Sequence, residues 1–165
     1  QLGGDPAQRV FVATAQAYDD EMRERIAAHT QERGGEFRTL EAPLQLTAAL
    51  AAIPRADVVV IDCVTFWLSN LLVGGARVET LLSETDALVA ELSRRRFHTV
   101  LVTNEVGMGV VPDNVLGRQF RDASGGAHQR LAAVADEIYF GMLGTLLRLR
   151  PEPLTLLAPE GRSRS

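Results

Sequence analysis

The sequence contains no lysine, and all 17 of its basic residues are arginine. A phosphate-binding loop of the G-x-x-x-x-G-K-[ST] type needs a lysine that reaches the phosphates of the nucleotide. The segment GRSRS, residues 161–165, resembles such a loop superficially, but it lacks the lysine, the second glycine and a following helix. The printed sequence therefore contains no phosphate-binding loop of this type.

Other features are also scarce, and each absence excludes a class of protein. Cys63 is the single cysteine, which excludes an internal disulfide and fits a reducing cytosol. The net charge is −4, and a nucleic-acid-binding protein usually has a basic excess. No apolar run approaches the roughly 18 residues of a membrane-spanning helix, and no charged and then apolar leader opens the chain. We expect a cytoplasmic protein without a membrane span or a nucleic-acid partner.

The chain has the composition of a globular domain. Of its 165 residues, 46% are hydrophobic and 23% are charged, which suits one domain with an apolar core. Short β-branched segments alternate with helical ones, so we expect an α/β fold with a mainly parallel sheet. The domain is expected to span residues 1–157, and the polar residues 158–165 to form a disordered tail.

The expected elements follow from apolar periodicity and from glycine and proline positions. Strands are predicted at Arg9–Thr14, Phe37–Glu41, Asp57–Asp62 and His98–Asn104, with a terminal pair at Ile138–Leu143 and Leu146–Arg150. Helices are predicted at Asp19–Arg33, Pro43 to about Ala52, Phe66–Leu72, Glu79–Arg96, and about Asn114 to Asp136 with an interruption at 124–126.

Polar side chains and glycines follow the apolar run HTVLV, which ends at Val102. Asn104 and Glu105 come next, and then Gly107 and Gly109 in a Gly-x-Gly turn. Ligands of open α/β sheets bind beyond the carboxyl ends of the strands, and glycine lets the backbone approach a ligand closely. The stretch therefore predicts a ligand-binding strand end.

Carboxylates also end two other predicted strands. Asp62 ends DVVVID, which is typical of a Walker B carboxylate that directs an oxygen ligand toward Mg²⁺. Such a run is common in α/β proteins, so an ordinary edge charge stays open as the alternative. The same alternative applies to Glu41, which ends FRTLE. Cys63, next to Asp62, is interpreted as a small buried residue.

His29 lies on the predicted helix Asp19–Arg33. Spacing alone puts it on one face with Met22, Ile26 and Arg33. It is either a boundary histidine of an amphipathic helix or a nucleophile or general base, because imidazole titrates near neutral pH. The nearby arginines, which would suit an anionic phosphate substrate, are Arg25, Arg33 and Arg38.

A further charged group lies on the predicted helix after Asn114. It consists of Arg118, Arg121 and Asp122. Arg118 and Asp122 have i,i+4 spacing, for which a surface ion pair is the simplest interpretation.

Together these segments closely resemble the bifunctional adenosylcobinamide kinase/adenosylcobinamide-phosphate guanylyltransferase family of cobalamin biosynthesis. The similar segments occur in the family's order and cover most of residues 9–143. They are Ala13–Gln16, Asp20–Met22 with Arg25, Ile26 and His29, Arg38–Pro43, Val60–Thr65, Ser69–Leu72, Val102–Pro112, Phe120–Asp122, and Gln129 through Ala135–Glu137.

The resemblance implies a RecA-like P-loop NTPase fold with helices on both faces of the sheet, assembled as a trimer. It also implies two reactions. ATP or GTP phosphorylates the aminopropanol hydroxyl of adenosylcobinamide, and GTP then transfers GMP to that phosphate, which gives adenosylcobinamide-GDP. In the family the second step passes through a GMP–histidine phosphoramidate.

The family's functional residues carry over onto matching positions. The resemblance makes His29 the nucleophile, consistent with the ability of a neutral imidazole to attack phosphorus. It makes Asp62 the carboxylate expected to face Mg²⁺. Nucleotide-binding positions are then Ala13, Thr14, Ala15, Thr30, Gln31, Glu32, Arg33, Glu41 and Asp62. Candidates on the cobinamide side are Asn104, Glu105, Arg121 and Asp122.

Two departures from the family pattern are visible. Family members begin with a strand and a GG-x-R-S-G-K-S loop, and the printed sequence starts after both, so we expect it to omit about 20–25 residues. Triphosphate binding without that loop should be much weaker. His128 stands where the family usually has Asn. The alternatives are an inactive family member that serves as a binding or assembly subunit, and an unrelated α/β protein.

Overall fold

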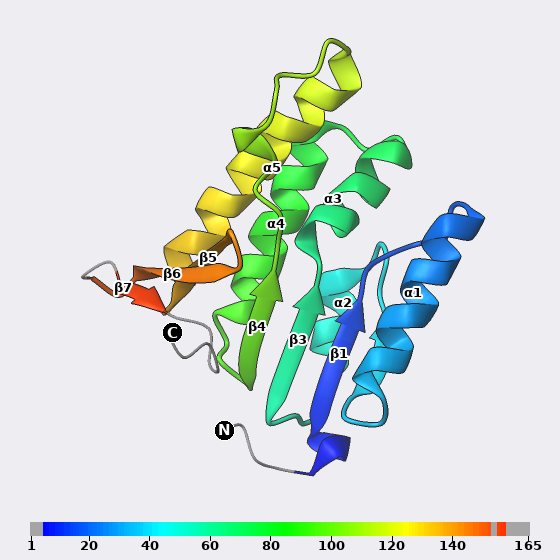
Figure 1. Ribbon diagram of the computed structural model, residues 1–165, viewed down its shortest axis with the longest axis vertical. Coiled ribbons are helices and arrows are strands. Elements are labelled where there is room, and N and C mark those ends of the chain that lie inside the picture. Colours follow the sequence, from blue (N-terminus) through cyan, green and yellow to red (C-terminus); the bar gives the residue numbers. More distant parts are fainter. Residues whose placement is uncertain (1–4, 153–154, 158–165) are drawn as a thin grey trace, which may run out of the picture.

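The computed structural model describes residues 5–152 and 155–157. Its main sheet has four parallel strands in the order β2-β1-β3-β4 (Figure 1). The strands are β1 (Arg9–Ala13), β2 (Arg38–Glu41), β3 (Val58–Asp62) and β4 (His98–Val102). All four were predicted, because each is a short apolar or β-branched run bounded by polar or turn residues.

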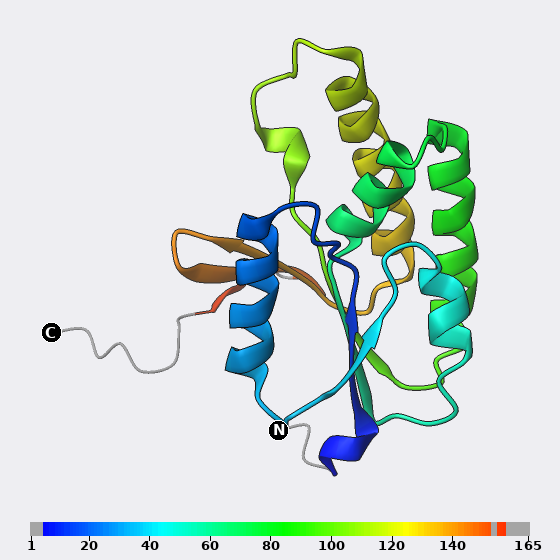
Figure 2. The same cartoon turned by 90° about the vertical axis from the view of Figure 1, so that its right-hand side faces the viewer.

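Helices cover the two faces of this sheet unequally. Figure 2 views the sheet along its edge, with α1 (Asp20–Arg33) on one side and the other helices on the opposite side. These are α2 (Leu46–Ala51), α3 (Val64–Val73), α4 (Val78–Leu92) and α5 (Val115–Val134). The predicted α/β fold with a parallel sheet between helices is confirmed.

The apolar core lies between the sheet and helices α2 to α5. Val12 of β1 and Ile61 of β3 are fully buried there, against Trp67 of α3 and Leu88 of α4. The opposite face of the sheet is more open, since Val100 of β4 is 46% exposed. Burial of apolar surface contributes about 25 cal/mol per Å². Most of this contribution therefore comes from the face of the sheet that α2 to α5 cover.

Helix α1 begins and ends as the sequence predicts. Asp19 caps its first turn, because its carboxylate accepts a hydrogen bond from the Met22 N–H at 2.7 Å. Gly34 ends the helix with a φ of 54°, a conformation that costs glycine little. The residues of α1 are exposed or half-buried, and its half-buried side chains include Met22, Ile26 and Arg33. Three of the four residues predicted to share one face are thus directed at the molecule, whereas His29 is exposed.

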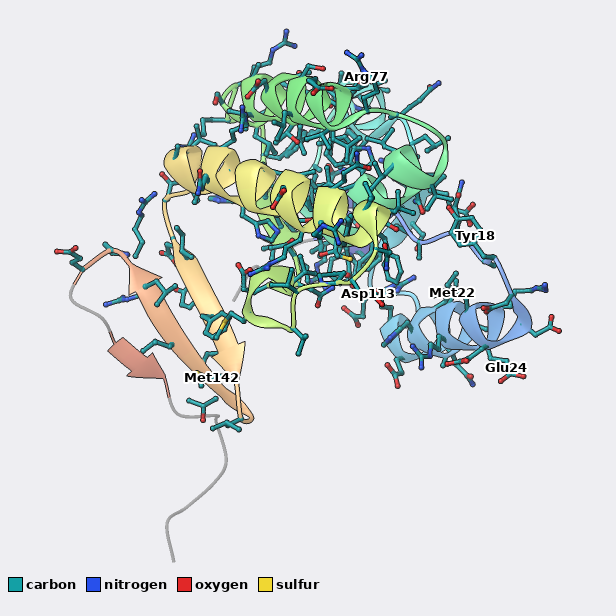
Figure 3. All side chains as sticks on the ribbon, turned by 90° about the horizontal axis from the view of Figure 1, so that it is seen from above. Tyr18, Met22, Glu24, Arg77, Asp113 and Met142 are labelled. Carbon is teal, nitrogen blue, oxygen red and sulfur yellow. The ribbon has the colours of Figure 1, made fainter. Side chains whose placement is uncertain are left out.

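A second, antiparallel sheet lies on the same side as α1. It contains β5 (Ile138–Met142), β6 (Thr145–Arg150) and β7 (Thr155–Leu157). Leu143 and Gly144 form the two-residue turn between β5 and β6, with φ values of 52° and 70°, as a tight hairpin requires. In Figure 3 the turn near Met142 and helix α1 both lie opposite the start of α4, which Arg77 marks. The hairpin was predicted, but β7 was not.

Several predicted boundaries were wrong. Helix α5 runs through Gly125 and Gly126 without the predicted interruption. A Cβ at Gly126 would lie 2.9 Å from Leu82 Cδ2, so glycine permits close packing of α5 on α4. Helix α2 begins at Leu46, three residues after Pro43, and α4 ends at Leu92 rather than Arg96. The predicted tail, residues 158–165, lies outside the described residues.

Within residues 5–152 and 155–157, no helix combines the length and the apolar character that crossing a membrane requires.

Candidate functional site

The carboxyl ends of the parallel strands bring two predicted carboxylates together. Ala13 is the register partner of both Glu41 and Asp62, and Asp62 is the partner of Val102. Partners on adjacent strands point to the same face. Because the preceding residue Ile61 is fully buried in the core, Glu41 and Asp62 face the opposite side, where they are exposed. The structure thus places Ala13, Glu41 and Asp62 in one row.

Thr14 holds the end of β1 on the start of α3. Its buried hydroxyl donates to the Cys63 carbonyl and accepts from the Cys63 N–H, both at 2.7 Å. Its backbone N–H donates to the Asp62 carbonyl at 3.2 Å. Thr14 therefore positions the strand end, and its side chain is engaged within the protein rather than directed at a ligand. Ala15, the next residue, is half-buried.

Cys63 is buried, as its sequence context predicts. Burial raises the pKa of its thiol, and the charge of Asp62 acts in the same direction more weakly. Its Sγ accepts from the Phe66 N–H at 3.4 Å and caps α3. A thiol with a raised pKa carries little thiolate at neutral pH, so Cys63 has a structural role.

A buried amide, which sequence reasoning did not assign, connects three loops at this edge. Asn70 is 2% exposed, and its Nδ2 donates to the Thr14 carbonyl at 2.8 Å and the Pro43 carbonyl at 3.0 Å. Its Oδ1 accepts from the Tyr18 hydroxyl at 2.9 Å. Figure 3 shows Tyr18 between this edge and α1. Asn70 thus ties the entrance of α1 to the strand ends.

His29 lies on the same side of the sheet as Asp62. Below it on α1, the Arg33 guanidinium lies 3.8 Å from the centre of the Phe11 ring, on the open face of β1. The His29 side chain is 74% exposed, and its Nδ1 lies 3.3 Å from a Glu32 carboxylate oxygen. Among the described contacts, none joins His29 to Glu41 or Asp62.

The other predicted residues of α1 are engaged mainly within the helix. Thr30 donates to the Ile26 carbonyl at 2.8 Å and accepts from Arg33 at 3.2 Å. Gln31 and Glu32 are exposed. Arg25 pairs with Glu21 at 2.7 Å. The helix thus offers an accessible imidazole beside exposed polar groups.

The loop after β4 is fixed by α5. Glu105 accepts from the Gly107 N–H at 2.8 Å and caps the 3₁₀ turn η2 (Val106–Met108). Arg121 donates to the Gly107 carbonyl at 3.0 Å. These contacts hold two predicted residues, Glu105 of the loop and Arg121 of α5, at Gly107.

The suggested Arg118–Asp122 ion pair is not present in the described contacts. The Arg118 guanidinium instead donates to the Asp113 carbonyl at 2.8 Å and the Pro112 carbonyl at 3.2 Å. Two main-chain carbonyls of the loop before α5 thus hold this arginine. Asp122 stays exposed.

His128 is a further polar residue at this edge, and sequence reasoning gave it no role. Its Nε2 lies 2.7 Å from the Thr103 hydroxyl, and its Nδ1 lies 3.5 Å from a Glu105 carboxylate oxygen. The Thr65 hydroxyl lies 3.2 Å from that of Thr103 and accepts from the Asn104 N–H at 2.8 Å. No periodic signal could have found this cluster, since its members come from three separate segments.

The donor set fits a magnesium ion bound together with phosphates. No group of three or more histidine, cysteine or acidic side chains forms a cation cage in the described part of the chain. Mg²⁺ does not need one, because it takes one or two carboxylates together with waters and substrate phosphates. Asp62 is an exposed carboxylate of this kind at a strand end.

Comparisons with known proteins agree with these features. A family model described as "Cobinamide kinase / cobinamide phosphate guanyltransferase" matches residues 3–149. The "Bifunctional adenosylcobalamin biosynthesis protein CobU" of Salmonella typhimurium is 38% identical over 162 residues, which cover 90% of each chain. The "Bifunctional adenosylcobalamin biosynthesis protein CobP" of Pseudomonas aeruginosa is 40% identical over 145 residues, 87% of this chain and 83% of the relative.

Proposed function

Because the chain belongs to the cobinamide kinase and cobinamide phosphate guanylyltransferase family, we propose that it catalyses both transfers in cobalamin biosynthesis. ATP or GTP phosphorylates the hydroxyl of adenosylcobinamide, and GTP then supplies GMP to the resulting phosphate. The parallel sheet between helices agrees with the P-loop NTPase-like fold of this family. The similar proteins are named as bifunctional, and nothing supports an inactive binding subunit.

The observation that carries the proposed site is the position of His29 on the side of the sheet that also holds Asp62 and Glu41. When Nδ1 carries the proton and faces Glu32 at 3.3 Å, the lone pair of the imidazole is on Nε2. Nε2 attacks the α-phosphorus of GTP and pyrophosphate leaves. The phosphate of adenosylcobinamide phosphate then takes GMP from His29, which divides the transfer into two easier steps.

The remaining predicted residues bind and orient the substrates. The main chain of positions 13–15, together with positions 30–33 and Glu41, lies along the nucleotide, and Asp62 holds Mg²⁺. The metal, when bound, neutralises charge on the phosphates. Asn104 and Glu105, with Arg121 and Asp122, form the cobinamide side. These assignments follow the family motifs and the arrangement of strand ends.

Replacing His29 by Ala is expected to abolish covalent labelling. The full-length protein incubated with Mg²⁺ and α-labelled GTP should gain acid-labile GMP, and the His29→Ala protein should remain at background. His98→Ala is the matched control, because His98 is also exposed but begins β4 at the opposite edge of the sheet. Undiminished label on His29→Ala would assign the nucleophile elsewhere.

We further propose that the protein acts in the cytoplasm as a homo-oligomer, a trimer as the family resemblance implies. Apolar side chains on the segment after β4 support association, since Met108 is 73% and Val110 96% exposed. Sedimentation equilibrium should give the mass of three chains. Val110→Glu should shift the protein toward lighter species, whereas a monomeric parent protein would contradict the proposal.

A further inference from the structure

His128 is held between an acid and a hydroxyl. Its side chain is 16% exposed, its Nδ1 faces Glu105 at 3.5 Å, and its Nε2 contacts the Thr103 hydroxyl at 2.7 Å. The other Glu105 oxygen accepts from the Gly107 N–H at 2.8 Å, so the carboxylate is fixed in place. The imidazole is thus sheltered, while Thr103 and Glu105 are exposed.

The hydrogen bonds of this cluster have a consistent direction. The Asn104 N–H donates to Thr65 Oγ1 at 2.8 Å, so the Thr65 hydroxyl can donate to Thr103 Oγ1 at 3.2 Å. In the tautomer with the His128 proton on Nδ1, toward Glu105, Thr103 donates to Nε2. A hydroxyl oxygen has two lone pairs. Thr103 therefore keeps one lone pair to accept a hydrogen bond from outside.

The free lone pair lies at the carboxyl edge of the sheet. Thr103 follows β4 directly, and the preceding residue Val102 is the register partner of Asp62. The cluster thus connects a sheltered imidazole to an exposed hydroxyl one residue beyond the register partner of the carboxylate proposed to lie near the phosphates.

Only one of the two proposed transfers needs such an acceptor. A phosphate monoester with a second pKa near 6 is already ionised at neutral pH, and His29 attacks as a neutral imidazole. The alcohol of adenosylcobinamide, in contrast, must lose a proton as it becomes a phosphate ester. A positioned base contributes about 10²- to 10⁴-fold to such a step.

We infer that in this chain, where His128 replaces the asparagine usual in the family, Thr103, His128 and Glu105 form a proton relay that serves the kinase step, an inference that rests on the proposed function. The alcohol oxygen bonds to the γ-phosphorus, and the bond from that phosphorus to the β-phosphate oxygen breaks to release the nucleoside diphosphate. The alcohol proton passes to Thr103 Oγ1 while the Thr103 proton passes to Nε2 of His128. Glu105 stabilises the resulting imidazolium. Thr103 touches the substrate, and the other two residues act through it.

The test compares the two transfers in the same full-length variants. Kinase turnover is measured with adenosylcobinamide, and guanylyl transfer with adenosylcobinamide phosphate supplied directly. Thr103→Val and His128→Gln should each lower the ratio of kinase kcat to guanylyl-transfer kcat by about 100-fold. The KM for adenosylcobinamide should change little, and Thr103→Ser should restore most of the ratio because it keeps the hydroxyl.

Each other outcome is decisive. An unchanged ratio in Thr103→Val, or an equal fall of both rates, overturns the relay and leaves a structural role for the cluster. A rise in KM at constant kcat assigns Thr103 to binding and also overturns it. Because Thr103 is exposed, its valine variant should fold even if His128→Gln does not, and thermal unfolding checks this. A parent protein that performs neither transfer would overturn the proposed function itself.

Discussion

Asp62→Asn is expected to lower both transfer rates by about two to three orders of magnitude while leaving the protein as stable as before. The substitution keeps the size of the side chain and removes one negative charge at the end of β3. Loss of one preorganised electrostatic contact to a reacting group typically costs 10²- to 10³-fold. The side chain is exposed, and surface substitutions usually change the free energy of unfolding by less than about 0.5 kcal/mol.

Initial rates of both transfers, measured over a range of Mg²⁺ concentrations, check this expectation. The Mg²⁺ concentration needed for half-maximal rate should rise together with the loss of kcat. Asp57→Asn is the matched control, because Asp57 precedes the same strand at its opposite end. Rates for Asp62→Asn within threefold of the parent protein would remove Asp62 from the metal-binding role.

The elements that the sequence predicted well are those with local causes. β3 is a run of valine and isoleucine that ends at Asp62, and α1 begins at a capping aspartate and ends at a glycine with positive φ. Each signal lies within a few residues of the element it defines. The sequence also indicated that Glu41 and Asp62 end their strands, and parallel strands bring their carboxyl ends to one edge.

The features that were missed depend on tertiary contacts. Two adjacent glycines in α5 predicted a break, since each costs roughly 0.5–1 kcal/mol in a helix. The close packing of Gly126 on Leu82, with Ala123 and Ala127 fully buried nearby, offsets that cost. Likewise, no local pattern indicates that Asn70 bonds residues 27 and 56 positions away.

Sequence reasoning named candidate residues for the site but not how their side chains lie. The family motifs named His29 and Glu105, but only the structure reveals that His128, 23 positions after Glu105, lies beside its carboxylate. The exposure of His29 also follows from tertiary structure, because α1 packs on the sheet through Arg33 and Phe11 rather than through a continuous apolar stripe. Side-chain environments of this kind need the folded chain.

Arg96→Met is expected to lower the free energy of unfolding by about 3 kcal/mol, although Arg96 lies away from the proposed site. Its guanidinium lies 2.6 Å from a carboxylate oxygen of Glu91, whose side chain is 7% exposed. It also donates to the Leu50 and Ile53 carbonyls at 2.7 and 2.8 Å, at the end of α2. Removing one partner of a buried ion pair costs about 3–5 kcal/mol. Arg94, 3.1 Å from the second Glu91 oxygen, keeps the loss near the lower limit.

Urea unfolding is measured for the parent protein, Arg96→Met, Arg94→Met and the double variant Glu91→Met/Arg96→Met. The comparison separates the cost of leaving the Glu91 charge unpaired from the cost of lost packing. Arg94→Met, the matched control, removes an exposed partner of the same carboxylate and should cost less than about 1 kcal/mol. Glu91→Met combined with Arg96→Met should recover more than half of the loss, because no unpaired charge is then buried. Equal losses in the single and double variants would contradict this account and assign the effect to the two carbonyls that Arg96 holds at the end of α2.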